Sequence, residues 1–382
     1  MMVFALVALA NLGNTLHKGG DFQDFLDAGR RTLDRRPLYE GSSPGSGVIG
    51  PPAQGVLFAP FAALAGLSDT ASRLAWYGVN LAALGVGLWG WTRAHQVVSG
   101  RRLGTTVDGF WPFLAVLMPL QTNFEHQNLN PLLLGVTGVG ALALARGRDT
   151  AAALLFGGAA ALKAFPALLV AYLLARGRWR VAGLATVVAV ALTATPALWY
   201  GPAAAWQNWT DWVDLVMRRD WPTRDQNQSV AAWLARLTDR STAEVAITLI
   251  FAAAVVALVS VARRMRSADA PCLAAELALV LGAAVLLSPI AWDHYWVLMF
   301  PAFLAVYSLR GPTRAAERTT FWVAAVLVSG ASPLTLGRHG FAVVRSWSNS
   351  TVAGLLLVAC LGWMLWRGAG RAPRPPADAR LS

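Results

Sequence analysis

The chain has 382 residues, of which 56% are hydrophobic and only 14% are charged, and its mean hydropathy is +0.48. This composition lies outside the range of soluble globular domains and predicts a polytopic membrane protein, with the lipid bilayer as its first partner. A net charge of +12 would suggest nucleic-acid binding in a soluble protein. Here the basic residues are placed as membrane topology requires, so we predict no nucleic-acid partner.

Apolar segments recur along most of the chain. Some reach the roughly 17–25 residues that a spanning helix needs, and others are shorter or interrupted by Pro and Gly. They cover residues 1–16, 51–67, 71–92, 110–121, 129–145, 151–175, 181–199, 243–262, 272–288, 294–309, 319–336 and 350–366. We expect an all-α, polytopic transmembrane fold of about 11–13 membrane helices. The first segment lacks a basic n-region and a cleavage site and is interpreted as a retained helix.

Arginine placement predicts the orientation of these helices. The positive-inside rule puts the basic segments in the cytoplasm and the two long loops, 17–50 and 201–242, outside. Each long loop holds five basic and five acidic residues, whereas 18 Arg and 5 acidic residues occupy 93–109, 146–149, 176–180, 262–271, 309–318 and 367–382. We expect one integral membrane domain, 1–366, and a basic, Pro-rich, disordered cytoplasmic tail, 367–382. Residues 51–92 must then cross an odd number of times, although they contain two apolar segments, so one of these is re-entrant or peripheral.

The first outer loop contains GGDFQDFLDAGRRTL, residues 19–33. Its apolar residues recur at helical spacing, which predicts an amphipathic interfacial helix with Asp21 at its N-terminal end. There a carboxylate is oriented by backbone N–H groups and kept ionised by the helix dipole, as a catalytic base requires. The alternative is that Asp21 only caps the helix, with Asp24 and Asp27 on its solvated face.

A run of amides, QTNFEHQNLNP, occupies residues 121–131 between two apolar segments. Neutral donors and acceptors at this density suit hydroxyl-rich ligands, although a polar hairpin turn is the simpler interpretation. A zinc site made by His294 with His126 or Glu125 lacks the H-x-x-x-H or H-E-x-x-H spacing. We therefore predict no metal and no other cofactor.

Two further polar positions interrupt apolar sequence. Lys163, one of two lysines beside 30 arginines, lies in ALKAFPALL, where a charge requires an anionic partner or a polar cavity. Phosphate is a natural partner, and snorkelling at a helix break is the alternative. In LLSPIAWDHYW, residues 286–296, Asp293 is positioned to orient His294, which could bind phosphate or move a proton.

The second outer loop predicts another interfacial helix, because Trp206, Trp209 and Trp212 recur every three residues. These rings either anchor the bilayer edge or stack on a sugar. The chain has no Walker loop, no G-x-G-x-x-G after a strand and no D-x-D sugar-nucleotide motif. If the chain is a sugar-transferring enzyme, its sugar donor would therefore have to be a molecule that resides in the membrane.

The order of six motifs resembles that of glycosyltransferase family 87, the polyprenol-phosphate-mannose-dependent alpha-(1,2)-mannosyltransferases of the GT-C superfamily. The resemblance extends over roughly residues 17–310 and is carried by GGDFQDFLDAGRRTLDRRPLY, PPAQGVLFAPFAAL, HQNLNPLLLG, ALKAFPALL, NQSVAAWLARL and SPIAWDHYW. The Ala- and Arg-rich, Lys-poor composition is also typical of GC-rich actinobacterial genes, in which this family is common.

The resemblance implies a GT-C-type fold and assigns roles by position. Asp21 matches the general base of the first outer loop, and Lys163 matches the lysine of a K-x-x-P pattern that meets the donor phosphate. His294 matches the first His of a W-x-H-H pattern whose second position is Tyr295 here. The resemblance places sugar or acceptor contacts at two motifs. In the G-Q-x-N pattern the matching residues are Gln127 and Asn130, and His126 replaces the usual Gly. In the N-Q-S pattern they are Asn227, Gln228 and Ser229.

The implied reaction moves a mannosyl or related unit from a polyprenyl-phosphate sugar to an envelope glycolipid or polysaccharide. The transfer would occur with inversion, on the extracytoplasmic face of a multi-pass plasma-membrane protein. Asp21 would take the proton of the acceptor hydroxyl, while Lys163 and His294 would stabilise the leaving phosphate. Asp24, Asp293 and His126 are secondary candidates. The alternative function is a multi-pass transporter or flippase, in which Lys163 and the polar breaks would form a substrate path.

Overall fold

The structure, a computed structural model of the chain, describes residues 10–13, 15–17, 20–43, 46–99, 109–217, 223–266, 272–309 and 315–368. Over these ranges every named element is a helix, and β pairing is limited to two isolated bridges. The predicted all-α class is therefore confirmed. Most of the first apolar segment, and the tail beyond residue 368, lie outside the described residues.

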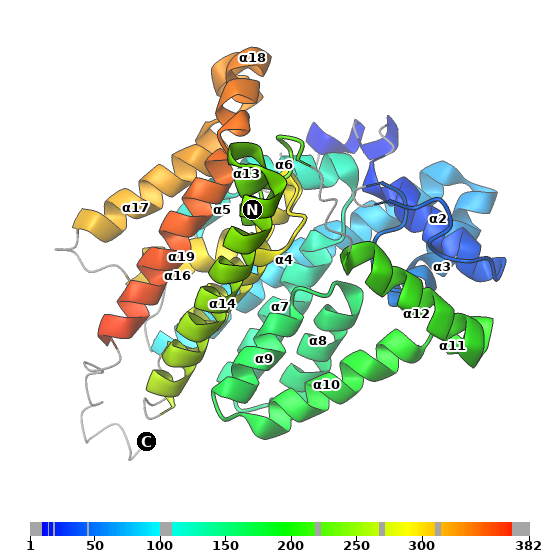
Figure 1. Cartoon of the computed structure of the whole chain (residues 1–382), viewed down its shortest axis with the longest axis horizontal. Helices are drawn as coiled ribbons and strands as arrows, with labels where there is room; N and C mark the ends of the chain where they lie inside the picture. The colour runs from blue at the N-terminus through cyan, green and yellow to red at the C-terminus, as the bar shows by residue number, and fades with distance from the viewer. Residues whose placement is uncertain are drawn as a thin grey trace.

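The helices follow one another closely, with short connections between most of them (Figure 1). In chain order they are α2 (Asp21–Leu33), α3 (Ala53–Leu67), α4 (Asp69–Ser99), α5 (Phe110–Ala115), α6 (Leu117–His126), α7 (Asn130–Ala145), α8 (Asp149–Leu162), α9 (Ala167–Ala175), α10 (Trp179–Ala194), α11 (Ala197–Tyr200), α12 (Pro202–Met217), α13 (Val230–Leu237), α14 (Arg240–Met265), α15 (Leu273–Leu287), the 3-10 helix η2 (Asp293–Met299), α16 (Phe300–Leu309), α17 (Ala315–Ala325), the π-helix η3 (Val326–Gly330), α18 (Pro333–Ser346) and α19 (Asn349–Gly368).

Three described stretches are long and apolar enough to cross a membrane: Trp179–Tyr200, α14 and α19. The pair formed by Ala315–Gly330 and α18, bent by 88°, gives a fourth if it is one broken span. The other apolar helices are shorter, because polar and proline-containing breaks divide the segments; α3, α7, α8 and α15 have 14–16 residues. The polytopic class is thus supported, whereas the count of about 11–13 membrane helices stays a prediction.

The two apolar segments in residues 51–92 form helices of very different length. The 15 residues of α3 extend about 22 Å and pack on α2, whereas the 31 residues of α4 extend about 46 Å, longer than the roughly 30 Å of a bilayer core. Glycines let α4 approach α7 closely: a Cβ on Gly87 would lie 2.8 Å from the Leu134 carbonyl carbon. By length α4 can cross a bilayer and α3 cannot, but α4 is not among the described stretches that are also apolar enough, so which of the two segments crosses stays a prediction.

Basic turns and polar breaks lie at opposite ends of the bundle. The helix α8 leaves the turn with Arg146 and Arg148, and α9 returns to Arg176, so the 163–166 connection lies about 21 Å away, at the other end of the hairpin (Figure 1). The helix α15 begins beside the same basic end, because Glu276 pairs with Arg176 at 2.9 Å. Its far end therefore places the 288–292 segment near the 163–166 connection.

Candidate active site

Asp21 begins α2, and Gly20 permits this position. Gly20 has a φ of +55°, and a Cβ there would lie 2.8 Å from the His126 Cα, so a larger residue would force α2 and α6 apart. The first turn of α2 is fixed on its other side by Phe25, whose ring stacks on Phe58 of α3 at 4.6 Å. These contacts direct Asp21 toward the amide-rich end of α6.

Two imidazoles flank the Asp21 carboxylate. The Nε2 atom of His294, a buried side chain, lies 3.1 Å from Asp21 Oδ2. The Nε2 atom makes no hydrogen bond to the described residues, so this contact is a close approach of the imidazole and the carboxylate. The His126 ring lies 5.4 Å from the His294 ring, centroid to centroid. The structure thus brings together three predicted residues that are far apart in the sequence.

Asn128 connects this carboxylate to Lys163. Its Nδ2 donates to Asp21 Oδ2 at 2.6 Å, and its Oδ1 accepts from Lys163 Nζ at 3.4 Å. Lys163 Nζ also donates to Asn130 Oδ1 at 2.9 Å. The base candidate and the cation candidate therefore belong to one hydrogen-bonded network.

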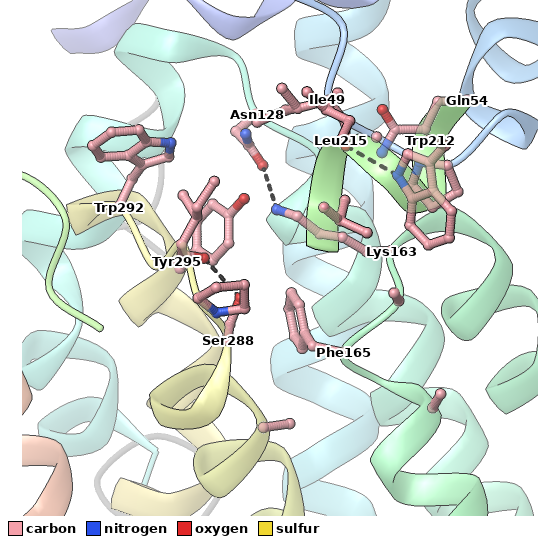
Figure 2. Close-up of a pocket in the computed structure, with 18 of the residues that line it drawn as sticks. Ile49, Gln54, Asn128, Lys163, Phe165, Trp212, Leu215, Ser288, Trp292 and Tyr295 are labelled. Atoms are coloured by element: carbon pink, nitrogen blue, oxygen red, sulfur yellow. Dashed lines mark hydrogen bonds between the residues drawn. The ribbon is translucent and has the colours of Figure 1, made fainter. Parts of the chain in front are cut away.

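Aromatic rings complete the surroundings of the lysine. Lys163 Nζ lies 3.5 Å from the ring centroid of Tyr295 and 5.7 Å from that of Phe165. Figure 2 shows the amine pointing at the Asn128 oxygen, with Tyr295 beside it. The Gln54 amide holds the preceding turn by donating to the Leu162 carbonyl at 2.8 Å. The predicted buried lysine is thus located at a helix break and held by neutral groups.

A cavity of about 600 Å³ opens beside this network. Asp21, Asp24, Asn128 and Lys163 form its polar end. The remaining wall is mostly apolar and includes Phe25, Leu168, Phe251 and Leu287. It also includes Phe165, Trp212, Leu215 and Trp292, which are labelled in Figure 2. Phe251 is 50% exposed on the outside of α14, so the apolar wall reaches the molecular surface. A cavity of this form suits a ligand with a polar head and a long apolar body.

The pKa values of two aspartates in α2, a helix too short to span a bilayer, are shifted in opposite directions. Burial acts to raise the pKa of Asp21, but His294, His126 and the amide of Asn128 outweigh it and hold the pKa well below its usual value. Burial, together with the charges of Asp21 and Asp27, raises the pKa of Asp24 to about 6. Asp21 is therefore the carboxylate that stays ionised near neutral pH.

The two amides at the predicted G-Q-x-N positions lie in different surroundings. Asn130 is in the network, where its Nδ2 donates to the His294 carbonyl at 3.2 Å. Gln127 is buried in a left-handed conformation with φ +52°, and its Nε2 donates to the Thr15 carbonyl at 2.7 Å. Its own carbonyl accepts from Trp76 Nε1 at 2.7 Å. Gln127 is thus committed to holding the turn that presents Asn128.

The predicted N-Q-S patch is fully buried and supports the 288–292 segment. Asn227 Oδ1 accepts from the Ala291 N–H at 2.9 Å, and the Ser229 hydroxyl donates to the Pro289 carbonyl at 3.1 Å. Gln228 Nε2 donates to the Arg345 carbonyl at 3.0 Å. None of the three is among the residues that line the described cavity. Their contacts favour positioning of the cavity wall over contact with a sugar.

Asp293 faces away from the network. Its Oδ2 accepts from Arg345 Nη1 at 3.4 Å, and Arg345 also pairs with Asp225 at 2.8 Å. Burial raises the pKa of Asp293 to about 7, although Arg345 opposes the shift. The carboxylate beside His294 is Asp21, so the structure gives Asp21 the place that the sequence allowed for Asp293. No group of three metal-ligating His, Cys, Asp or Glu side chains occurs within the described residues.

The sequence did not single out Asn128 and Tyr295 as site residues. Asn128 is one of several amides in a row, so the sequence does not distinguish it from its neighbours. Tyr295 was noted only as the residue that replaces a histidine. The fold and the site together define a helical membrane protein in which a carboxylate, an imidazole and an ammonium group meet at the polar end of an apolar cavity.

Comparison with known proteins agrees with this description. The family model "Glycosyltransferase family 87" matches residues 49–289. A polyprenol-phosphate-mannose-dependent alpha-(1-2)-phosphatidylinositol mannoside mannosyltransferase of Mycolicibacterium smegmatis is 30% identical over 83% of this chain and 76% of its own. The protein of the same name from Mycobacterium tuberculosis is 29% identical over 80% of this chain and 74% of its own. No solved structure matches the chain significantly.

The chain therefore belongs to glycosyltransferase family 87, and it is a membrane glycosyltransferase. This membership confirms the resemblance carried by the six motifs, and the mycobacterial relatives agree with the composition typical of actinobacterial genes. It does not favour the transporter alternative. The GT-C-type arrangement stays a prediction, since no solved structure supports it.

Proposed function

We propose that the chain transfers a mannosyl unit from a polyprenyl-phosphate mannose to a glycolipid of the phosphatidylinositol mannoside kind, or to a related envelope polysaccharide. The names of the two relatives support the donor and the acceptor class. The observation that carries the proposal is the joint position of Asp21 and Lys163 at the polar end of the apolar cavity. An isoprenoid chain fits the apolar wall, and its phosphate would meet the ammonium group.

In the proposed reaction Asp21 is the general base. The acceptor oxygen attacks the anomeric carbon, the bond from that carbon to the phosphate oxygen breaks, and the acceptor proton moves to Asp21. Both contacts of the Asp21 carboxylate among the described residues use Oδ2, and the side chain is 26% exposed. Oδ1 can therefore receive the proton. Attack from the face opposite the phosphate inverts the anomeric configuration.

Lys163 and His294 would stabilise the phosphate as it leaves with the bonding electron pair. A preorganised ammonium group and a preorganised imidazole N–H donor in a water-poor site are effective in this role because little reorganisation is needed. Asn130 would orient Lys163, and Gln127 the turn that carries Asn128. Asn227, Gln228 and Ser229 would hold the 288–292 wall against the donor. The reaction as proposed uses no metal ion.

We further propose that the site faces the extracytoplasmic side of the plasma membrane. The supporting observation is that the arginine turns and the 163–166 connection occupy opposite ends of the α8–α9 hairpin. By the positive-inside rule the arginine end is cytoplasmic. Lys163 then lies about 21 Å above it, inside the outer half of the bilayer, where a lipid-linked phosphate is within reach.

The test is transfer of radiolabelled mannose in membranes that contain this chain. Polyprenyl-phosphate mannose is supplied with a panel of phosphatidylinositol mannosides and envelope polysaccharides, and labelled products are separated by chain length. Label in a glycolipid or polysaccharide product supports the proposal, and a reversed anomeric configuration at the new linkage supports direct inversion. Transfer only from a polyprenyl-phosphate arabinose would contradict the assignment of the sugar.

A further inference from the structure

The base and the cation of this site lie close together but do not pair. Asp21 and Lys163 both belong to the described residues, yet no ion pair within 4.0 Å joins them. Opposite charges in a weakly polar interior attract strongly and approach unless something keeps them apart. A direct pair would occupy the oxygen that must accept a proton and the ammonium group that must meet a phosphate. Some group therefore has to separate them.

The amide of Asn128 is placed between the two charges. Its N–H donates to the carboxylate at 2.6 Å and its oxygen accepts from the ammonium at 3.4 Å, so each end of the amide dipole faces the charge of opposite sign. The flipped amide would turn its NH2 toward the ammonium and its oxygen toward the carboxylate. Only the observed orientation satisfies both charges.

The Asn128 backbone is fixed from both sides. Its N–H donates to the Asn123 carbonyl at 3.3 Å, and its own carbonyl accepts from Asn123 Nδ2 at 3.2 Å. The preceding residue, Gln127, is held in its left-handed conformation by the bonds with Thr15 and Trp76. Because the backbone is clamped and the residue is only 4% exposed, the amide cannot easily swing out of the gap.

Two neutral groups hold the lysine on the far side. Asn130 Oδ1 accepts from Lys163 Nζ at 2.9 Å, and the Tyr295 ring face lies 3.5 Å from the same atom. Both contacts attract the cation without neutralising it. A phosphate that enters the cavity would exchange these weak contacts for a charge-assisted one.

We propose that Asn128 is a positioning residue that keeps the Asp21 carboxylate and the Lys163 ammonium connected but unpaired, so that both remain available to the two substrates. This inference rests on the proposed roles of Asp21 and Lys163. It adds a third residue, which acts through both of them and separates the acceptor side of the site from the donor side.

The first test measures the separation itself and needs no activity. An apolar carbodiimide activates a carboxyl group in the membrane, and an amine in direct contact then forms an amide bond that mass spectrometry detects. We expect little cross-linking of Asp21 to Lys163 in the wild-type chain and at least about a tenfold higher yield in Asn128→Ala, because the two charges can then meet. Equal yields in the two proteins would overturn the inference.

Two further variants keep this test informative. Asn128→Ser, a smaller change, replaces Asn128→Ala if that protein does not insert, and the same rise in cross-linking is expected. Asn349→Ala is the matched control, since Asn349 is a buried amide that bonds the Leu327 carbonyl, away from the cavity. A similar rise in Asn349→Ala would show a general loosening and would overturn the inference.

The second test uses the pH dependence of transfer. Asn128→Asp places a carboxyl group beside Asp21, which should raise the pKa of the base and shift the acid limb of kcat/KM upward by about one pH unit or more. An unshifted limb would show that the side chain of residue 128 does not contact Asp21 in the active protein, which would overturn the inference. A wild-type protein without transfer activity would instead contradict the proposed function. The cross-linking experiment would still test whether Asn128 keeps Asp21 and Lys163 apart.

Discussion

Asp21 and Asp24, one helical turn apart in α2, differ in what surrounds them. Two imidazoles and an amide surround Asp21, whereas Asp24 lines the cavity with two carboxylates as its charged neighbours along the helix. The pKa of Asp21 is lowered, and that of Asp24 is raised from 3.8 to about 6. The position of the histidines therefore decides which aspartate can serve as a base at neutral pH.

The raised pKa of Asp24 predicts a pH-dependent stability. Because the folded-state pKa of about 6 exceeds the unfolded value of 3.8, the contribution of the neutral carboxyl is complete below pH 3.8 and is lost as the pH rises through about 6. We expect Asp24→Asn to be more stable than the wild-type chain at pH 8 by about 1 kcal/mol, with solvent screening of this partly exposed group taken into account. Thermal unfolding in detergent at pH 8 and pH 4.5 measures the difference.

The stability that Asp24→Asn gains at pH 8 should disappear at pH 4.5. Asp34→Asn is the control, because it removes only the exposed pair with Arg36, at 3.0 Å, and Asp34 does not contribute to the pKa of Asp24. An equal gain at both pH values, or the same gain in Asp34→Asn, would show that the effect does not come from the ionisation of Asp24.

At Lys163 we expect the charge, and not the size of the side chain, to govern transfer. Lys163→Met keeps a long unbranched chain but removes the cation that meets the phosphate, so kcat/KM for the donor should fall at least about 100-fold, or roughly 3 kcal/mol. Arg148→Met is the matched control, because Arg148 is exposed at the opposite end of α8. Steady-state kinetics with a varied donor concentration would refute the role of Lys163 if the two variants behaved alike.

At the scale of the helices, the sequence indicated the polar helix ends and breaks best where a charged residue interrupts an apolar segment. Lys163 and His294 were proposed because polar groups within apolar sequence are costly in a membrane protein and need a reason. Asp21 was proposed from its position at the N-terminal end of an amphipathic helix. The contact between Asp21 and His294 joins residues 273 positions apart, and no local spacing encodes it. The bracing role of Asn227 was also hidden, since a buried amide that bonds backbone and one that bonds a sugar look alike in sequence.

Helix lengths were the least predictable feature. Hydropathy treats residues 151–175 as one segment, but the structure divides it at Lys163 and Pro166 into α8 and α9. The break arises because Lys163 takes an extended conformation to reach its amide partners, and Pro166 then starts the next helix. The polar contacts that build the site are thus the same ones that shorten the helices.

The entry of the chain into α2 offers a test at this scale. Gly20→Ala combines a positive φ with a Cβ only 2.8 Å from the His126 backbone, so α2 should shift or the variant should lose about 1–2 kcal/mol of stability. Because Asp21 is the next residue, transfer should fall more than stability does. Gly66→Ala is the control, since nothing lies within 4 Å of a Cβ there. Equal activity in the two variants would contradict this account of how Asp21 is placed.

At the scale of the whole molecule, the separation of basic turns from polar breaks predicts the orientation in the membrane. In a background with Cys272 and Cys360 replaced, an impermeant maleimide should label Ser42→Cys in intact cells, because residues 17–50 are predicted to form an outer loop. Arg148→Cys, in the turn before α8, should be labelled only after permeabilisation. The reverse pattern would put the cavity on the cytoplasmic side and contradict the proposed location.

The most direct measurement of the central claim is a single-turnover transfer assay with radiolabelled polyprenyl-phosphate mannose, comparing Asp21→Asn with the wild-type chain. Asp27→Asn is the control, since this residue lies on the same helix but pairs with Arg31. We predict a loss of at least about 1,000-fold, near 4 kcal/mol, in Asp21→Asn, with insertion and thermal stability retained. Asp27→Asn should transfer normally. Unchanged transfer in a folded Asp21→Asn protein would contradict the assignment of Asp21 as the base.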